Sequence, residues 1–369
     1  MAGHPTSPEL LQEAVDALAI AGNQMQAALR LGINRKTYMS RLKLAQARGF
    51  LPLRKEPAFE IDDLPSGDEP IEELLERRSR AFHLKDRAEQ ARKLIDVRIK
   101  LDGPIGIVHF GDPHVDDDGC DLPTLRRHVE IVQSTPGMFG ANVGDLQNNW
   151  VGRLSHLWGQ QETSKKTAWR LTEWLVRSVD WLYLVGGNHD AWSGAGDPLQ
   201  WITRDQAGVF DYGGVRLNLK FPNGKQIRVN ARHDFKGHSM WNPGHGPLKA
   251  AMMGWRDHIL SCGHTHTSAY LMTKDPASGL ISHILRLAGY KKHDRYAKEL
   301  GLPDGAVSPA AVTIIDPTKD DDDPALVSVF HDVELAAKVL RMLRTDHDRP
   351  LEVNRDKRIN GRKNARIAA

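Results

Sequence analysis

Apolar residues recur at helical spacing near the start of the chain and predict three short helices between residues 8 and 48. Pro8 opens the first helix, and Gly22 ends it. Asn23 and Asn34 are suited to cap the second and third helices, because an asparagine side chain accepts a hydrogen bond from an amide of the first turn. The pattern predicts a small all-α domain over residues 1–50.

A short turn around Gly32 joins the second predicted helix to a basic third helix, which is the helix-turn-helix pattern. The string AALRLGINRKTYMSRL resembles the Fis-type helix-turn-helix of bacterial regulators. The resemblance covers about a tenth of the chain and implies that residues 34–43 lie in the major groove of DNA. The candidate DNA contacts are Arg35, Lys36, Thr37 and Arg41. The alternative is a three-helix module for protein docking or self-association.

Prolines and acidic residues dominate residues 51–70, which predicts a linker. Residues 71–98 carry apolar residues among dense alternating charges and predict a long, mostly exposed helix. Residues 51–102 are therefore expected to connect the first domain to a second one.

From residue 103 the pattern changes to apolar, β-rich runs, each followed by small residues and then by side chains of the metal-ligand type. The runs are residues 104–110, a strand that ends at residue 143, and residues 181–185, 226–231 and 258–262. The side chains that follow them are Asp112 and His114, then Asp145, then Asn188, His189 and Asp190, then His233, and finally His264 and His266. Because strand ends and the loops beyond them form the active site in sheets of this kind, we expect these residues to meet.

Metal coordination explains this choice of residue types. Imidazoles and carboxylates together suit Mn²⁺, Fe or Zn²⁺, and Asp-x-His and His-x-His place two side chains on the same side of an extended segment. Asparagine is a weak ligand, so Asn188 among aspartates and histidines favours a site in which a carboxylate bridges two ions.

The ordered series D-x-H, G-D, G-N-H-D, H and G-H-x-H resembles the calcineurin-like metallophosphoesterase superfamily over residues 103–330. The resemblance implies an α/β fold, a four-layer α/β/β/α sandwich. It implies a first metal held by Asp112, His114 and His266, a second held by Asn188, His233 and His264, and Asp145 as the bridge between them.

The resemblance also implies roles beyond the metals. His189 would contact the phosphate and assist the leaving oxygen, and Asp190 would orient it. For the fourth motif, His238 and His245 are the alternatives to His233, which we prefer because it follows its strand directly.

The implied reaction is hydrolysis of a phosphodiester by a metal-activated hydroxide, with two divalent ions, Mn²⁺ first and Fe, Zn²⁺ or Mg²⁺ as alternatives. A DNA-binding module beside such a centre favours DNA as the substrate, and the combination resembles phage- or prophage-type chains. One alternative is a phosphatase that acts on a phosphoprotein or a small nucleotide. Another is a DNA-binding regulatory protein whose phosphoesterase site is degenerate.

Three further segments were weighed for substrate contacts. Residues 147–153 are rich in hydrogen-bonding groups and are expected to line the cleft, with Arg153 on a phosphate. Trp241 could stack on a base, but we expect it to pack in the interior. Residues 211–214 are predicted to form a hairpin turn, because they lack the lysine and hydroxyl of a P-loop.

Composition narrows the class of protein. The 369 residues are 40% hydrophobic and 26% charged, which excludes wholesale disorder, and no apolar run approaches the roughly 20 residues that cross a bilayer. Two cysteines are too few for a disulfide framework, so we expect a cytoplasmic protein without a membrane contact. Residues 331–369 are predicted to form a helical, basic tail, and self-association is left open.

Overall fold

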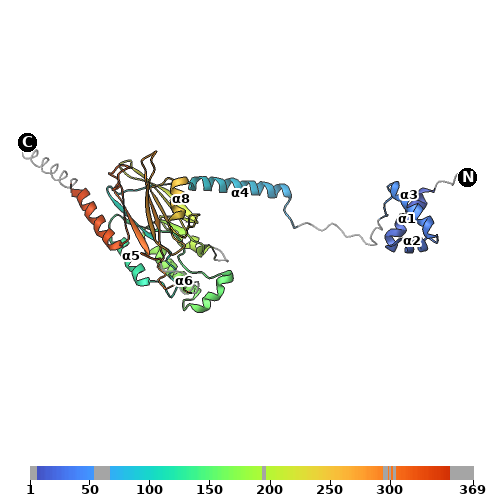
Figure 1. Ribbon diagram of the computed structural model, residues 1–369, viewed down its shortest axis with the longest axis horizontal. Coiled ribbons are helices and arrows are strands. Elements are labelled where there is room, and N and C mark those ends of the chain that lie inside the picture. Colours follow the sequence, from blue (N-terminus) through green and yellow to red (C-terminus); the bar gives the residue numbers. More distant parts are fainter. Residues whose placement is uncertain are drawn as a thin grey trace, which may run out of the picture. The chain divides into compact units, whose positions relative to one another are not determined.

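The computed structural model describes residues 6–53, 67–192, 197–293, 298, 301 and 305–349. The chain forms two compact units, Met1–Glu76 and Arg77–Ala369 (Figure 1). The expected linker over residues 51–70 lies mostly outside the described residues.

The first unit contains the three expected helices, α1 (Pro8–Ala21), α2 (Gln24–Arg30) and α3 (Arg35–Ala47). Both predicted caps form, because Asn23 Oδ1 accepts from the Gln26 amide at 2.9 Å and Asn34 Oδ1 accepts from the Thr37 amide at 2.9 Å. Tyr38 is fully buried, and its hydroxyl donates to the Ala14 carbonyl at 2.8 Å, which fastens α3 to α1.

The charged segment that follows is a helix only in part. α4 (Ile71–Arg92) has no buried residue, as expected of an exposed helix. The predicted helix over residues 71–98 is wrong at its end, because β1 (Ile95–Arg98) is a strand that pairs in parallel with β6 (Gly214–Lys220). Its alternating burial places two apolar residues against the core, so the sheet begins before residue 103.

The second unit is built on two six-stranded sheets. The first sheet has the order β12-β11-β2-β3-β4-β5, and the run from β2 to β5 is parallel. Its strands are β2 (Ile105–Phe110), β3 (Met138–Asn142), β4 (Trp181–Gly186), β5 (Val209–Tyr212), β11 (Ala310–Ile315) and β12 (Val327–Phe330).

The second sheet has the order β1-β6-β7-β8-β10-β9. Its remaining strands are β7 (Gln226–Arg232), β8 (Ile259–Cys262), β9 (Ala269–Lys274) and β10 (Ile281–Arg286). The predicted hairpin turn at residues 211–214 is wrong. β5 belongs to the first sheet and β6 to the second, so this segment carries the chain from one sheet to the other.

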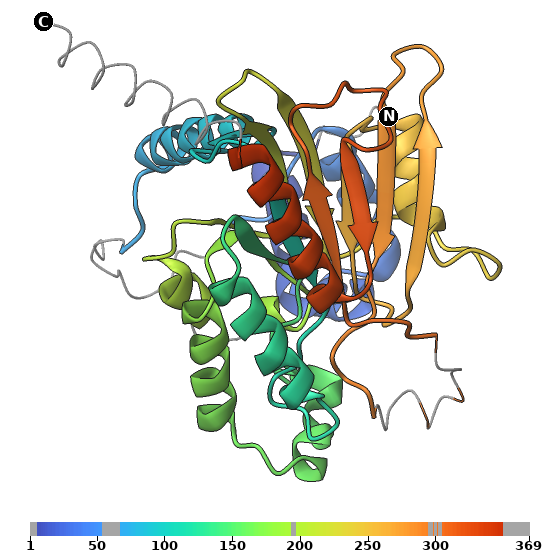
Figure 2. The same cartoon turned by 90° about the vertical axis from the view of Figure 1, so that its left-hand side faces the viewer.

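The packing confirms the four-layer α/β/β/α sandwich. A core of aliphatic residues fills the space between the two sheets. A second core joins the outer face of the first sheet to α5 (Leu122–Ser134), α6 (Lys165–Arg177) and the helix over residues 333–349. α8 (His245–Met253) covers the outer face of the second sheet, so helices lie on both sides of the strands (Figure 2).

The C-terminal segment differs from the tail that the sequence predicts. The helix over residues 333–349 buries Val333, Ala336, Ala337 and Leu340 against the first sheet, so its first half belongs to the folded core. Residues 350–369 lie outside the described residues. The remaining helical elements are η1 (Gly152–Gln160), η2 (Asp190–Trp192) and α7 (Pro198–Thr203). Among the described residues, no helix is both long and apolar enough to cross a bilayer.

Candidate metal centre

The candidate ligands lie just beyond the carboxyl ends of strands in both sheets. β2, β3 and β4 run in parallel in the first sheet and are followed by residues 112–114, 145 and 188–190. β7 and β8 run in parallel in the second sheet and are followed by residues 233 and 264–266. The two sheets thereby bring seven side chains together: Asp112, His114, Asp145, Asn188, His233, His264 and His266.

The first group consists of Asp112, His114 and His266, whose ligand atoms all lie within 4.8 Å of one another. The Nε2 atoms of His114 and His266 are 3.2 Å apart, and Nε2 of His266 is 3.4 Å from Asp112 Oδ2. Asp112 and His114 are buried, while His266 is half-buried.

The second group consists of Asp145, His233 and His264, again within 4.8 Å. Nε2 of His233 is 3.0 Å from Nδ1 of His264 and 3.2 Å from Asp145 Oδ2. Asn188 completes this group, because its Oδ1 lies 2.8 Å from the same His233 nitrogen.

Asp145 faces both groups. Its Oδ2 is 3.2 Å from Nε2 of His233 in the second group and 4.0 Å from Nε2 of His114 in the first. A carboxylate in this position is suited to bridge two ions.

The spacing of these atoms fits divalent ions. Around an ion with ligand distances of about 2.1 Å, neighbouring ligand atoms lie about 3.0 Å apart in an octahedron and about 3.4 Å apart in a tetrahedron. The shortest distances between ligand atoms in the two groups, 2.8 to 3.4 Å, match these edges. In the described part of the chain, no hydrogen bond reaches the buried Oδ1 of Asp112, and a buried acceptor without a partner is costly unless a cation satisfies it.

The backbone of the site is strained. Five described non-glycine residues have a positive φ, and all lie in these loops: His114, Asp145, Asn149, His264 and His266. Such conformations cost about 1–3 kcal/mol each and cluster at functional sites. Four of the five are candidate ligands, so the strain lies in the residues that would hold the metals.

The glycines before the ligands allow the loops to approach closely. A Cβ added at Gly263 would overlap the carboxylate of Asp112, and one added at Gly187 would overlap that of Asp145. The same carboxylates are held by amides of these loops. The amide of His264 donates to Asp112 Oδ2 at 2.6 Å, and the amide of His189 donates to Asp145 Oδ1 at 2.9 Å.

The electrostatics of the site favour the metal-binding protonation states of His114 and Asp145. Burial lowers the pKa of His114 well below its usual range, and His266 and His189 act in the same direction. Burial opposes ionisation of Asp145, but His233 outweighs it and holds the pKa of this carboxyl well below its usual value. His233 is the exception, because burial lowers its pKa but Asp145 overrides this and raises it to about 10. A cation that binds His233 would therefore displace a proton.

His189 lies beside Asp145 and beside His114 of the first group. Its ring Nδ1 donates to the backbone carbonyl of Asn148, and its Nε2 is 4.0 Å from Asp145 Oδ2. Asn149 Nδ2 donates to the His189 carbonyl at 2.9 Å, and the Trp150 ring meets the imidazole edge to face. The residues after Asp145 therefore hold this histidine.

The predicted role of Asp190 as the group that orients His189 is wrong. Its carboxylate accepts hydrogen bonds from the amides of Gly187 at 2.9 Å and Leu146 at 3.1 Å. Burial and the neighbouring Asp145 raise the pKa of Asp190 to about 7. Asp190 instead joins the loops that follow β3 and β4, and a backbone carbonyl orients His189.

Sequence reasoning did not assign the polar network behind Asn148. The Asn148 amide donates to Asp116 at 2.7 Å, and its side-chain amide donates to Asp117 at 2.7 Å and to Gln161 at 3.1 Å. Lys291 lies 3.0 Å from Asp117 and above the Trp150 ring. The density of hydrogen-bonding residues after Asp145 was the available signal, whereas Lys291 lies in no recognisable motif.

The other sequence-predicted residues lie elsewhere. Arg35 and Lys36 are exposed on α3, and Thr37 and Arg41 are half-buried on the same helix. His238 and His245 lie outside both ligand groups, on the segment between β7 and α8 and at the start of α8. The side chain of Arg153 lies outside the described residues.

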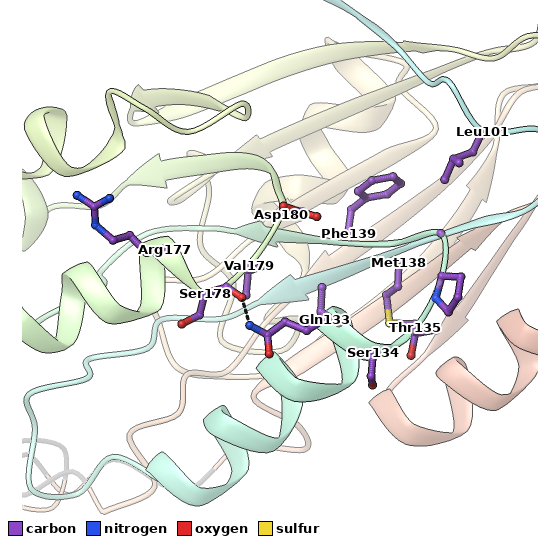
Figure 3. Close-up of a pocket in the computed structure, with 13 residues that line it drawn as sticks. Leu101, Gln133, Ser134, Thr135, Met138, Phe139, Arg177, Ser178, Val179 and Asp180 are labelled. Atoms are coloured by element: carbon purple, nitrogen blue, oxygen red, sulfur yellow. Dashed lines mark hydrogen bonds between the residues drawn. The ribbon is translucent and has the colours of Figure 1, made fainter.

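One hollow of the described structure lies at the opposite end of β3 from the candidate ligands. It has a volume of about 470 Å³ and is lined by residues 132–139, residues 177–180 and Leu101 (Figure 3). It lies where β3 begins, whereas the ligands follow the ends of the strands. None of the candidate ligands lines it.

No family model matches the chain, and no curated protein matches it. Among solved structures, the calcineurin-like phosphoesterase YfkN from Bacillus subtilis is 12% identical, with 69% of this chain and 99% of that chain covered and a TM-score of 0.34.

Two further solved structures are similar in the same way. A predicted phosphoesterase from Streptococcus pneumoniae TIGR4 is 14% identical, with 62% of this chain and 98% of that chain covered and a TM-score of 0.28. The 5'-nucleotidase from Candida albicans SC5314 is 14% identical, with 66% and 58% covered and a TM-score of 0.29. Because these scores are low, we argue function from the residues of this chain.

Proposed function

We propose that the chain hydrolyses phosphodiester bonds with two divalent cations, and that DNA is its substrate. The observation that carries this proposal is the position of Asp145, whose Oδ2 faces His233 of one ligand group and His114 of the other. Two three-residue groups with one carboxylate that faces both are suited to hold two divalent ions.

The side chains divide the work as follows. Asp112, His114 and His266 would hold one ion, His233, His264 and Asn188 would hold the other, and Asp145 would bridge them. Ions at such a centre neutralise phosphoryl oxygens and lower the pKa of water toward about 7.

In this proposal His189 donates a proton to the leaving oxygen. Because its Nδ1–H is donated to the Asn148 carbonyl, a proton on Nε2 requires the imidazolium form, and that form can protonate a departing alkoxide. The other ring nitrogen, Nε2, lies 4.0 Å from Oδ2 of the candidate ligand Asp145.

The first unit supports DNA as the substrate. Eight lysines and arginines and no acidic residue lie between Ala17 and Lys55, and Arg35 and Lys36 are exposed on α3. A basic helix that follows a short turn is suited to enter the major groove. Such a unit would bring duplex DNA to the phosphodiesterase centre.

A substrate panel with Mn²⁺ tests the proposal. The panel contains duplex DNA, single-stranded DNA, RNA, a bis-aryl phosphodiester and an aryl phosphomonoester. We expect turnover of the diesters and of DNA, with little turnover of the monoester. Preferential hydrolysis of the monoester would favour the phosphatase alternative, and no hydrolysis in the panel would contradict the proposal.

Removal of residues 1–50 tests the DNA part separately. We expect weaker duplex binding with a flatter dependence on salt, because phosphate contacts release counterions. Turnover of the bis-aryl phosphodiester should stay the same, because none of the seven ligands lies in this unit. Unchanged duplex binding would instead favour the protein-docking alternative.

A further inference from the structure

The segment between His233 and α8 exposes two large apolar side chains beside one another. Met240 is 94% exposed and Trp241 is 92% exposed. The expectation that Trp241 packs in the interior is therefore wrong. We call residues 236–244 the Trp241 loop.

The Trp241 loop is attached at its first end to the segments that carry the metal ligands. Its His238 lies 4.0 Å from Asp234, the residue after the ligand His233. Asp234 in turn binds Arg286 at 2.9 Å. Arg286 donates to the Gly263 carbonyl at 2.8 Å and to Thr265 at 3.0 Å, on either side of His264.

The other end of the loop lies against β9, which begins three residues after His266. A Cβ added at Gly244 would lie 2.7 Å from Leu271 and 3.4 Å from Ala269. The two ends of the Trp241 loop are therefore held by segments that adjoin His233, His264 and His266.

The charge of this region suits a polyanion. Residues 235–256 contain Lys236, Lys249 and Arg256 and no aspartate or glutamate. Lys236 and Lys249 are exposed, and within the described part of the chain no ion pair neutralises either one. Trp255 is less exposed than Trp241, at 37%, and the guanidinium of Arg232 lies 4.3 Å from its ring centroid.

We infer that the Trp241 loop binds a single-stranded segment of the polynucleotide substrate, with the Trp241 indole stacked on a base and Lys236 and Lys249 near the backbone phosphates. Exposed aromatic rings in a basic setting bind single strands in this way, because every base has a π-face. The inference rests on the proposed phosphodiesterase function and adds that the enzyme engages unpaired nucleotides next to the scissile bond.

Kinetics with two substrates test this inference. One is a short thymidine oligonucleotide, and the other is the bis-aryl phosphodiester, which has no base. In the full-length chain with Mn²⁺, Trp241→Ala should raise KM for the oligonucleotide by about 5- to 150-fold, the range that corresponds to loss of one stacked base. It should leave kcat/KM for the small diester unchanged, and Trp241→Phe should restore most of the affinity.

Met253→Ala is the matched control, because Met253 is 80% exposed at the far end of α8. This variant should leave KM and kcat/KM unchanged for both substrates. Binding of the oligonucleotide in EDTA, measured by fluorescence anisotropy, should weaken with Trp241→Ala and not with Met253→Ala. An unchanged oligonucleotide KM, or a change only in the oligomeric state, would overturn the inference while the small diester is still hydrolysed. Failure to hydrolyse the small diester would instead count against the proposed function.

Discussion

At the scale of single residues, the candidate centre departs from ordinary backbone and side-chain rules. His114, Asp145, His264 and His266 adopt positive φ, and imidazole nitrogens lie 3.2 Å apart in the first ligand group and 3.0 Å apart in the second. None of these features stabilises the fold by itself, and each is expected of side chains that would hold cations. The identity of these residues could be predicted from motifs. Their positive φ angles could not, because these depend on how the loops after the strands pack against one another.

Histidine also serves a purely structural role in this protein. His109 is fully buried between the sheets, with Nδ1 2.8 Å from the Tyr183 hydroxyl and Nε2 2.9 Å from Thr313 Oγ1. Burial lowers the pKa of His109 to about 3. Between pH 6.5 and 3 the unfolded chain therefore binds one more proton at this residue than the folded chain, and stability falls as the pH falls.

We predict that His109→Gln makes the free energy of unfolding less sensitive to acid. Below pH 6.5 the wild-type chain should lose up to about 1.4 kcal/mol more per pH unit than the variant. Urea unfolding in EDTA at several pH values measures this difference, and the other titrating groups are common to both chains. Parallel pH curves for the two chains would contradict the assignment of His109 as a buried neutral residue.

At the scale of elements, the sequence predicted the helix caps and strands that depend on residues close together in the chain. The caps at Asn23 and Asn34 and the strands before each ligand are all present, because they depend on neighbouring residues. β1 and the crossing at residues 211–214 were missed. Both depend on pairing with distant strands, and four residues at a sheet edge carry too weak a pattern to reveal it.

The cap of α3 gives a prediction at this scale. Asn34→Ala removes the side-chain acceptor of the Thr37 amide and should destabilise the helix by about 1 kcal/mol. Amide hydrogen exchange in residues 35–47 should become about fivefold faster, while Asn34→Asp should preserve the wild-type rate. Equal exchange rates in all three chains would show that the cap does not limit opening of this helix.

At the scale of the whole molecule, the sandwich is what brings the ligands together. Asp112, His114, Asp145 and Asn188 follow strands of one sheet, and His233, His264 and His266 follow strands of the other. Hydrogen bonds from the amide of His264 to Asp112 and from the ring of His233 to the Val143 carbonyl join the two sets. The order of motifs predicted this convergence, whereas exposure of Trp241 could not be predicted, because a tryptophan's sequence neighbours do not determine its burial.

The number of divalent ions bound per chain tests the central claim most directly. After equilibration with Mn²⁺ and removal of unbound metal, elemental analysis should find about two ions per chain in the wild type. The His189→Ala variant should also bind about two ions, because His189 is not a candidate ligand. His264→Ala and Asp145→Asn should each bind fewer ions, and all three variants should lose turnover. Wild-type protein that binds no Mn²⁺, or His264→Ala that keeps both ions and full activity, would contradict the account.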